Sequence, residues 1–185
     1  LASGQTSVLY PPLYLGLALT RLGWGDPRPI VDVLVILHFL LAVLGMYLLL
    51  RRLRIGRAVS VGASFLWMSF PFLVVVARSW IFVSYTAAYL PWGLLLVERL
   101  LARPVAARVL ALAAVKALFI YQGYVQYVIL ATLFEGVYLG LRWAAAAEAR
   151  ADWRRQALAY GLALAATGAL AAPLLFPMLH AKQVS

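Results

Sequence analysis

The sequence predicts an all-α, polytopic transmembrane helix bundle. The chain has 185 residues, of which 65% are hydrophobic and 12% are charged, whereas soluble domains are roughly 45–50% apolar and about 25% charged. Its apolar residues form continuous runs of about 20, the length that crosses the hydrocarbon core, and not the alternating segments of about ten that build a membrane β-barrel. A water-soluble domain and a β-barrel are both excluded.

Six of these apolar runs predict six membrane spans, which form a helix-bundle domain over residues 30–185. The runs lie near residues 30–50, 58–77, 80–97, 106–121, 124–143 and 156–179. Short polar or basic segments separate them, as expected for the loops of a multi-pass protein.

Residues 1–29 are predicted to form an outer loop with one short re-entrant or interfacial helix. The apolar stretch 8–22 contains Pro11-Pro12 and has only about fifteen residues, fewer than the roughly 20 that span a bilayer. Its length favours a non-spanning helix, and a spanning one stays open. Because the chain starts and ends abruptly beside apolar runs, we expect an internal fragment of a longer chain.

Basic residues predict the orientation of the bundle. Sixteen Lys and Arg oppose six Asp and Glu, for a formal net charge of +10. The predicted topology places most of the arginines in loops on one side: Arg51, Arg52, Arg54, Arg57, Arg99, Arg103, Arg108, Arg142, Arg150, Arg154 and Arg155. The positive-inside rule assigns that side to the cytoplasm. A nucleic-acid-binding protein would carry such residues on one face of a soluble domain, so no nucleic-acid partner is expected.

Three ionisable side chains lie inside predicted spans: His38, Lys116 and Glu135. Each costs about 2.5–3.5 kcal/mol to insert, so each is a candidate functional residue. At 1.5 Å per residue all three lie within roughly 8 to 17 Å of the outer surface, where they could share one polar cavity. Lys116 and Glu135 are either a structural ion pair or a phosphate-binding lysine with its orienting carboxylate. His38 is either a hydrogen-bonded neutral imidazole or a proton carrier.

Aromatic and amide side chains gather at the predicted outer ends of the spans. They are Gln5, Tyr10, Tyr14, Trp80, Tyr85, Tyr89, Tyr121, Gln122, Tyr124, Gln126 and Tyr127. An aromatic belt at the lipid interface explains them. A sugar-binding surface, with rings stacked on pyranose faces and amides on hydroxyl groups, is the alternative. Gln122 and Gln126 are spaced by one helical turn and are the best local pair for it.

Two further patterns suggest contacts of the predicted bundle. Arg78 stands in a very short outer loop, where it would contact either a pyrophosphate or lipid headgroups. Small residues recur every four positions at Gly161, Ala165 and Ala169, a spacing that predicts close approach of a neighbouring helix. With no Cys and two His, no metal site is expected from these residues, and metal dependence stays open.

Several segments together resemble the YfhO-like bacterial membrane proteins. They are Ala2–Pro11 (ASGQTSVLYP), Leu37–Arg51 (LHFLLAVLGMYLLLR), Leu90-Pro91-Trp92, Gln122–Gln126 (QGYVQ) and Leu174–Pro177 (LLFP). The resemblance implies a GT-C-like bundle and an integral membrane glycosyltransferase of the bacterial cytoplasmic (inner) membrane. Such an enzyme transfers a sugar from a polyprenyl-phosphate donor to a cell-envelope acceptor on the outer face. No covalently bound cofactor is implied; the partners are membrane lipid, the lipid-linked sugar and the acceptor.

The resemblance also assigns candidate residues. Where the family has Gly-His-Pro-Gln, this chain has Gly-Tyr-Val-Gln, so Gly123 and Gln126 carry over. The acidic general base of the family is expected upstream of Leu1, which implies that this fragment alone is inactive. The substrate-binding candidates are Gln5, His38, Arg78, Lys116, Gln122 and Gln126.

Two other functions stay open at this point: a membrane carrier or flippase for a lipid or solute, and a non-catalytic membrane assembly subunit. A carrier predicts inverted repeats and spans broken near the membrane midplane. A transferase predicts one or two acidic residues in the outer loop before Leu1. The sequence does not specify the sugar, the acceptor or the oligomeric state.

Overall fold

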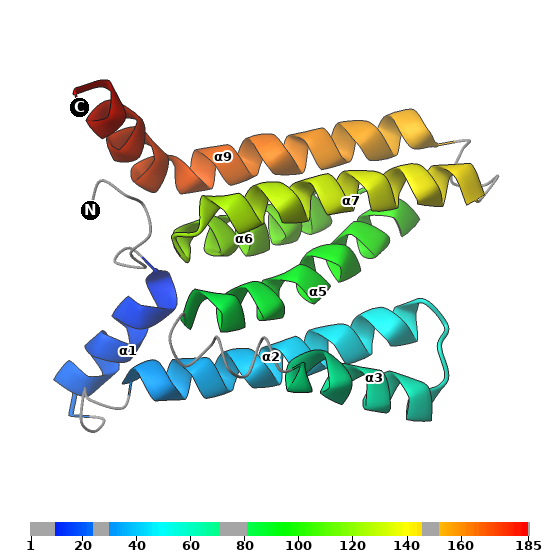
Figure 1. Ribbon diagram of the computed structural model, residues 1–185. Coiled ribbons are helices and arrows are strands. Elements are labelled where there is room, and N and C mark those ends of the chain that lie inside the picture. Colours follow the sequence, from blue (N-terminus) through cyan, green and yellow to red (C-terminus); the bar gives the residue numbers. More distant parts are fainter. Residues whose placement is uncertain (1–9, 24–29, 71–80, 146–151, 185) are drawn as a thin grey trace.

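The computed structural model describes residues 10–23, 30–70, 81–145 and 152–184, and within them every regular element is a helix. The helices are α1 (Pro11–Arg21), α2 (Ile30–Arg52), α3 (Arg57–Ser69), α5 (Ile81–Ala102), α6 (Ala106–Tyr121), α7 (Val125–Ala145) and α9 (Trp153–Val184). The all-α prediction is confirmed for this part of the chain. Figure 1 shows their arrangement as a bundle of elongated helices, with the shorter α1 beside the start of α2.

Within the described residues, three helices are long and apolar enough to cross a membrane, which indicates a membrane protein. The candidate spans are Ile30–Arg52 in α2, Gln126–Ala145 in α7 and Trp153–Phe176 in α9. Helices α1, α3 and α6 have 11, 13 and 16 residues, and at 1.5 Å per residue even the longest is about 24 Å, against a hydrocarbon core of about 30 Å. The predicted span over 58–77 is a helix only to Ser69 within the described residues.

Helix α5 forms the centre of the bundle. It packs against α2 on one side and against α6, α7 and α9 on the other (Figure 1). Most residues from Val83 to Leu100 are buried. Because α5 faces other helices and not lipid, its sequence accommodates buried polar groups such as Ser84 and Glu98.

Pro91 lies inside α5 and removes one backbone hydrogen bond of that helix. Proline has no N–H to donate to the carbonyl four residues earlier, which here belongs to Ala87. The indole Nε1–H of Trp67 in α3 donates to this carbonyl at 3.1 Å. Trp92 of α5 in turn donates its Nε1–H to the Leu41 carbonyl of α2 at 2.9 Å. The two tryptophans therefore connect α5 to α2 and α3 at the level of the proline.

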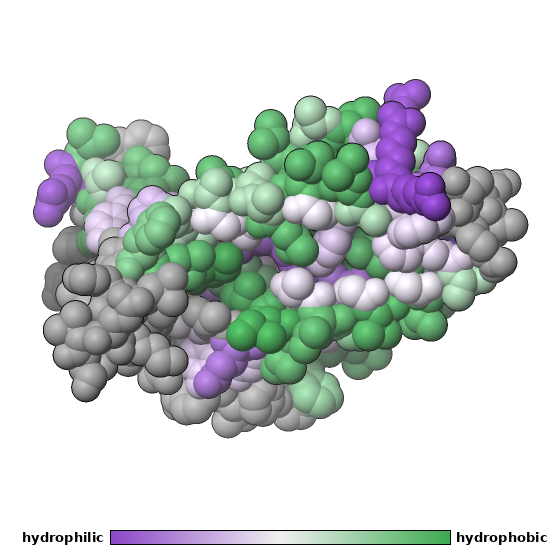
Figure 2. Space-filling model, turned by 90° about the horizontal axis from the view of Figure 1, so that it is seen from above, coloured by the Kyte–Doolittle hydropathy of each residue, from purple (hydrophilic) through white to green (hydrophobic). Residues whose placement is uncertain are grey.

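One end of the bundle carries most of the described positive charge. The α2–α3, α5–α6 and α7–α9 connections all lie at this end (Figure 1). The arginines there are Arg51, Arg52, Arg54, Arg57, Arg99, Arg103, Arg108, Arg142, Arg154 and Arg155, and we call this the arginine-rich end. Where Figure 2 is coloured, hydrophobic side chains prevail, and the largest of the hydrophilic groups lies toward the right-hand end. Apolar sides with charged ends are the pattern expected of a bundle embedded in lipid.

Helix α9 packs against α6 through a different face from the predicted one, which was the stripe of Gly161, Ala165 and Ala169. Ala163, Thr167 and Ala171 are buried, and Thr167 Oγ1 lies 3.4 Å from the Ala113 carbonyl of α6. Gly161 and Ala165 are exposed, so the predicted contact through this stripe is wrong. Small residues occur on all sides of α9, and their spacing alone therefore does not identify the packed face.

Candidate functional site

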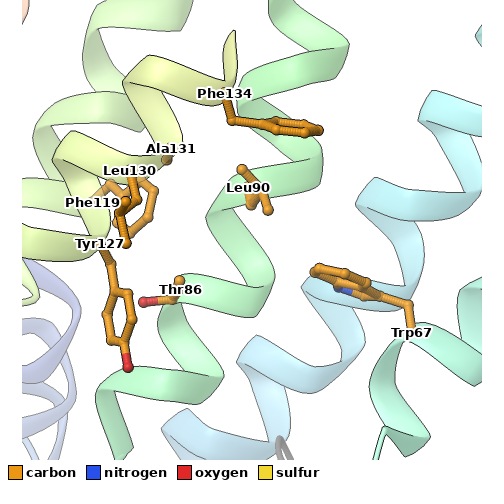
Figure 3. A pocket seen from close by; sticks show the side chains of 8 residues that line it. All are labelled: Trp67, Thr86, Leu90, Phe119, Tyr127, Leu130, Ala131 and Phe134. Atoms are coloured by element: carbon orange, nitrogen blue, oxygen red, sulfur yellow. The ribbon is translucent and has the colours of Figure 1, made fainter. Parts of the chain in front are cut away.

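An apolar groove lies between α3, α5, α6 and α7. Its volume is about 460 Å³, and it is lined by Trp67, Thr86, Leu90, Phe119, Tyr127, Leu130, Ala131 and Phe134. Figure 3 shows Trp67 of α3 on one side of the groove and the α7 side chains on the other, with Leu90 and Thr86 of α5 between them. The volume falls in the range of about 300–1,000 Å³ that is typical of ligand sites.

The groove is apolar along most of its length and has two hydroxyl groups, those of Thr86 and Tyr127, at one end, which we call the hydroxyl-bearing end. Tyr127 lies in the first turn of α7 and Thr86 in the second turn of α5, both toward the end of the bundle opposite the arginine-rich end. Leu90 and Phe134 follow them one and two turns further along the same helices. A ligand with an apolar tail and a polar head therefore fits with its head at Thr86 and Tyr127.

Gln122 lies beside the hydroxyl-bearing end. Thr86 Oγ1–H donates to Gln122 Oε1 at 3.2 Å, and Gln122 is the fully buried C-cap of α6. Gly123 follows with φ +93°, a left-handed conformation that suits glycine and reverses the chain into α7. Gln126 then lies exposed on α7. The predicted pairing of Gln122 and Gln126 on one helical turn is wrong, because the turn at Gly123 separates them.

His38 belongs to a closed aromatic cluster next to α1. Its Nδ1–H donates to the Leu34 carbonyl at 2.6 Å, which makes Nε2 the acceptor for the Tyr10 hydroxyl. Because Tyr10 donates to His38, the Tyr89 hydroxyl donates to Tyr10. Tyr85 stacks on Tyr10 with ring centroids 4.8 Å apart. Desolvation by burial, with a smaller effect of Tyr89, raises the pKa of the Tyr10 phenol, so this phenol remains a neutral donor.

Lys116 and Glu135 meet in a second closed cluster between α6 and α7. Lys116 Nζ lies 2.7 Å from Glu135 Oε2 and donates to Thr132 Oγ1 at 3.1 Å. Tyr160 of α9 donates to the same carboxylate oxygen at 2.8 Å. Gly93 makes room for the carboxylate, since a Cβ there would lie 2.8 Å from Oε1. The lysine charge is neutralised within the bundle, and Lys116 does not line the groove.

The sequence predicts that His38, Lys116 and Glu135 share one polar cavity, but the structure places them in these two separate clusters. His38, Lys116 and Glu135 are each 2% exposed, so none of them opens onto solvent or lipid. Tyr10, Tyr85 and Tyr89 are also buried, so neither the belt nor the sugar-surface interpretation describes these three residues. Gln5 and Arg78 lie outside the described residues.

A third buried polar cluster, built on the carboxylate of Glu98, was missed by the sequence analysis. Glu98 of α5 accepts a hydrogen bond from Tyr138 at 2.7 Å, and its Oε1 lies 2.7 Å from Arg142 Nε. Both charged residues stand at predicted span ends, where a charge signals topology, and nothing in their spacing marks them as partners. The groove residues were also missed. The one available signal was Pro91, because a proline inside a helix leaves the carbonyl of Ala87 in need of another donor, which Trp67 provides.

Among the residues that the structure describes, no group of three or more His, Asp or Glu is placed to hold a metal ion. Comparisons of the chain with protein families, curated proteins and solved structures find no match. The groove is therefore the candidate site on the basis of its geometry.

Proposed function

We propose that the protein is an integral membrane glycosyltransferase of the GT-C type, similar to the YfhO-like proteins. Its donor is a sugar carried on polyprenyl phosphate, and its acceptor belongs to the cell envelope. The observation that carries this proposal is the groove, which is apolar along the depth of the bundle and has the Thr86 and Tyr127 hydroxyls at one end.

The groove matches the two chemical parts of such a donor. An isoprenoid chain is apolar and flexible, and Leu90, Phe119 and Phe134 offer it a hydrocarbon and aromatic surface whose burial yields about 25 cal/mol per Å². The phosphate and sugar are polar and must stay near the membrane surface, because polar groups are costly in hydrocarbon. Tyr127 can donate a hydrogen bond to them there, and Thr86 Oγ1, whose proton goes to Gln122, can accept one from a sugar hydroxyl.

The charge distribution supports an outward-facing site. With the arginine-rich end in the cytoplasm, as the positive-inside rule requires, the Thr86–Tyr127 end faces the outside. The proposed topology has six spans: the candidate spans in α2, α7 and α9, the 22-residue α5, and the shorter α3 and α6. A bilayer accommodates such short spans by thinning locally. The membrane is then the bacterial cytoplasmic membrane.

The reaction requires a base near the hydroxyl-bearing end. An acceptor hydroxyl attacks the anomeric carbon, the bond from that carbon to the phosphate oxygen breaks, polyprenyl phosphate leaves, and a base takes the hydroxyl proton. Glu135 is held by Lys116 and Tyr160 and is not available for this role. We assign the base to the region before Leu1 and keep Arg78 as the candidate cation for the departing phosphate.

A photoreactive farnesyl phosphate tests the site directly. Crosslinked to the purified protein in lipid nanodiscs, it should label groove residues of α5 and α7. Leu130→Trp narrows the groove and should lower labelling by about tenfold. Leu133→Trp is the matched control, because Leu133 lies on the same helix, is 63% exposed and does not line the groove. Equal labelling of the two variants would show that the groove does not bind the donor.

A second measurement separates the three functions. Protein reconstituted with a glycosyl polyprenyl phosphate and envelope acceptors should release polyprenyl phosphate if it is a transferase. A carrier would move the intact donor between leaflets, and an assembly subunit would do neither. An intact donor after incubation of the full-length protein with acceptor would contradict the transferase.

A further inference from the structure

The turn between α2 and α3 concentrates positive charge at the arginine-rich end. Arg51, Arg52, Arg54 and Arg57 are all exposed. Within the described part of the chain, the ion pairs are those of Lys116 with Glu135 and Arg142 with Glu98, so no carboxylate there neutralises these four arginines. Arg51 donates to the Ile55 carbonyl at 2.5 Å, and the turn presents a compact cationic surface.

Arg54 occupies a backbone position that favours glycine. Its φ is +65°, and the bonds from Arg54 N to Arg51 O at 3.1 Å and from Ile55 N to Leu50 O at 3.0 Å form the Schellman ending of α2. A side chain with a Cβ is disfavoured in this left-handed conformation. The backbone conformation therefore does not favour an arginine at this position.

A second apolar groove runs from this turn along the α2–α3 pair. Its volume is about 330 Å³, and it is lined by Leu40, Val43, Leu44, Tyr47, Val61, Ser64 and Phe65. Tyr47 precedes Arg51 by four residues and Val61 follows Arg57 by four, so the groove begins about 6 Å from the arginines. Leu40 and Phe65 are 62% and 59% exposed, so in a membrane this groove opens toward lipid.

We infer that the α2–α3 turn and this groove bind one anionic phospholipid. The phosphodiester lies against Arg52, Arg54 and Arg57, since guanidinium groups pair with phosphate oxygens through several N–H donors. An acyl chain lies in the groove. The site is at the opposite end of the bundle from Thr86 and Tyr127, and it does not depend on the proposed function.

The charge distribution favours a lipid over a second copy of the chain. Two copies packed through this face about a two-fold axis along the membrane normal would bring the same arginines together. Like charges at such a contact repel. An anionic lipid instead neutralises them.

Native mass spectrometry with a mixture of dioleoyl phosphatidylglycerol and dioleoyl phosphatidylcholine tests the charge. The protein should retain phosphatidylglycerol preferentially. Arg52→Gln with Arg54→Gln should lower that retention by about tenfold. The matched double variant Arg154→Gln with Arg155→Gln, at exposed positions of α9, should change it by less than about twofold. Equal losses in the two double variants, or equal retention of both lipids, would overturn the site.

The same assay tests the groove. Val61→Trp fills it and leaves all four arginines in place, so retention should fall. Val59→Trp is the control, because Val59 is 64% exposed on α3 and does not line the groove. Arg54→Gly should lower retention and raise thermal stability in lipid-free detergent, which excludes misfolding as the cause. Equal effects of the two tryptophans, or a dimer that persists regardless of lipid, would contradict the inference.

Discussion

The indole N–H of Trp67 donates to the carbonyl of Ala87 at 3.1 Å, and this carbonyl is the one that Pro91 deprives of its helical partner. Trp67 also forms one wall of the candidate groove. One side chain therefore satisfies the backbone of the central helix and shapes the site beside it.

Trp67→Phe should lower the free energy of unfolding by about 1–3 kcal/mol, because the buried carbonyl loses its donor. Adding Pro91→Ala supplies a backbone N–H to Ala87 and should recover most of this loss. Denaturation with sodium dodecyl sulfate in mixed micelles, followed by circular dichroism, gives the free energies. A double variant no more stable than Trp67→Phe alone would show that the indole acts only by packing.

Lys116→Met should destabilise the protein by about 3–5 kcal/mol, because Glu135 would keep a buried charge without a partner. The double variant Lys116→Met with Glu135→Leu removes both charges and should be clearly more stable than the single variant. The same unfolding measurement checks this. Transfer activity that survives in the double variant would limit the pair to a structural role.

Glycine substitutions separate close contacts from open positions. Gly45→Ala places a Cβ 2.7 Å from the Trp92 ring, and Gly93→Ala places one 2.8 Å from Glu135 Oε1, so each should cost about 1–3 kcal/mol. Gly136→Ala is the control: its Cβ would meet no atom within 4 Å, and it should gain up to about 1 kcal/mol from helix propensity. A neutral Gly93→Ala variant would show that the carboxylate moves freely.

Arg54→Gly should stabilise the protein in detergent by about 1–2 kcal/mol, because glycine adopts the left-handed conformation without a Cβ clash. Arg54→Ala removes the same charge and keeps a Cβ, so it should gain much less. Thermal unfolding of both variants separates backbone strain from charge repulsion. Equal gains in the two would point to repulsion among the arginines.

The chain has no native cysteine, so single introduced cysteines report its orientation. A membrane-impermeant maleimide applied outside intact cells should label Gln126→Cys, and it should label Arg54→Cys only after the membrane is opened. Both positions are exposed and lie at opposite ends of the bundle. Labelling of both from one side would contradict the proposed crossing pattern.

The sequence predicts the helices well because each one depends on local apolar content. The run 106–121 coincides with α6, and 30–50 falls within α2. Tertiary contacts cannot be predicted in the same way, because they depend on residues that are far apart in the chain. A tyrosine at the end of a span serves equally in a lipid interface or in a core, so the burial of Tyr10, Tyr85 and Tyr89 depends on α1 folding against α2 and α5. The groove combines side chains from four helices, and no spacing in the chain encodes it.

The central position of α5 bears on how the protein enters the membrane. A segment that carries Glu98, Pro91 and two tyrosines would expose polar groups to hydrocarbon if it moved alone into lipid. We expect the translocon to retain α5 until it can pack against α2, which precedes it in the chain and accepts the hydrogen bond from Trp92. These two helices would then associate before the C-terminal half of the chain is synthesised. The helix most fully surrounded by other helices would then be the one whose insertion most depends on them.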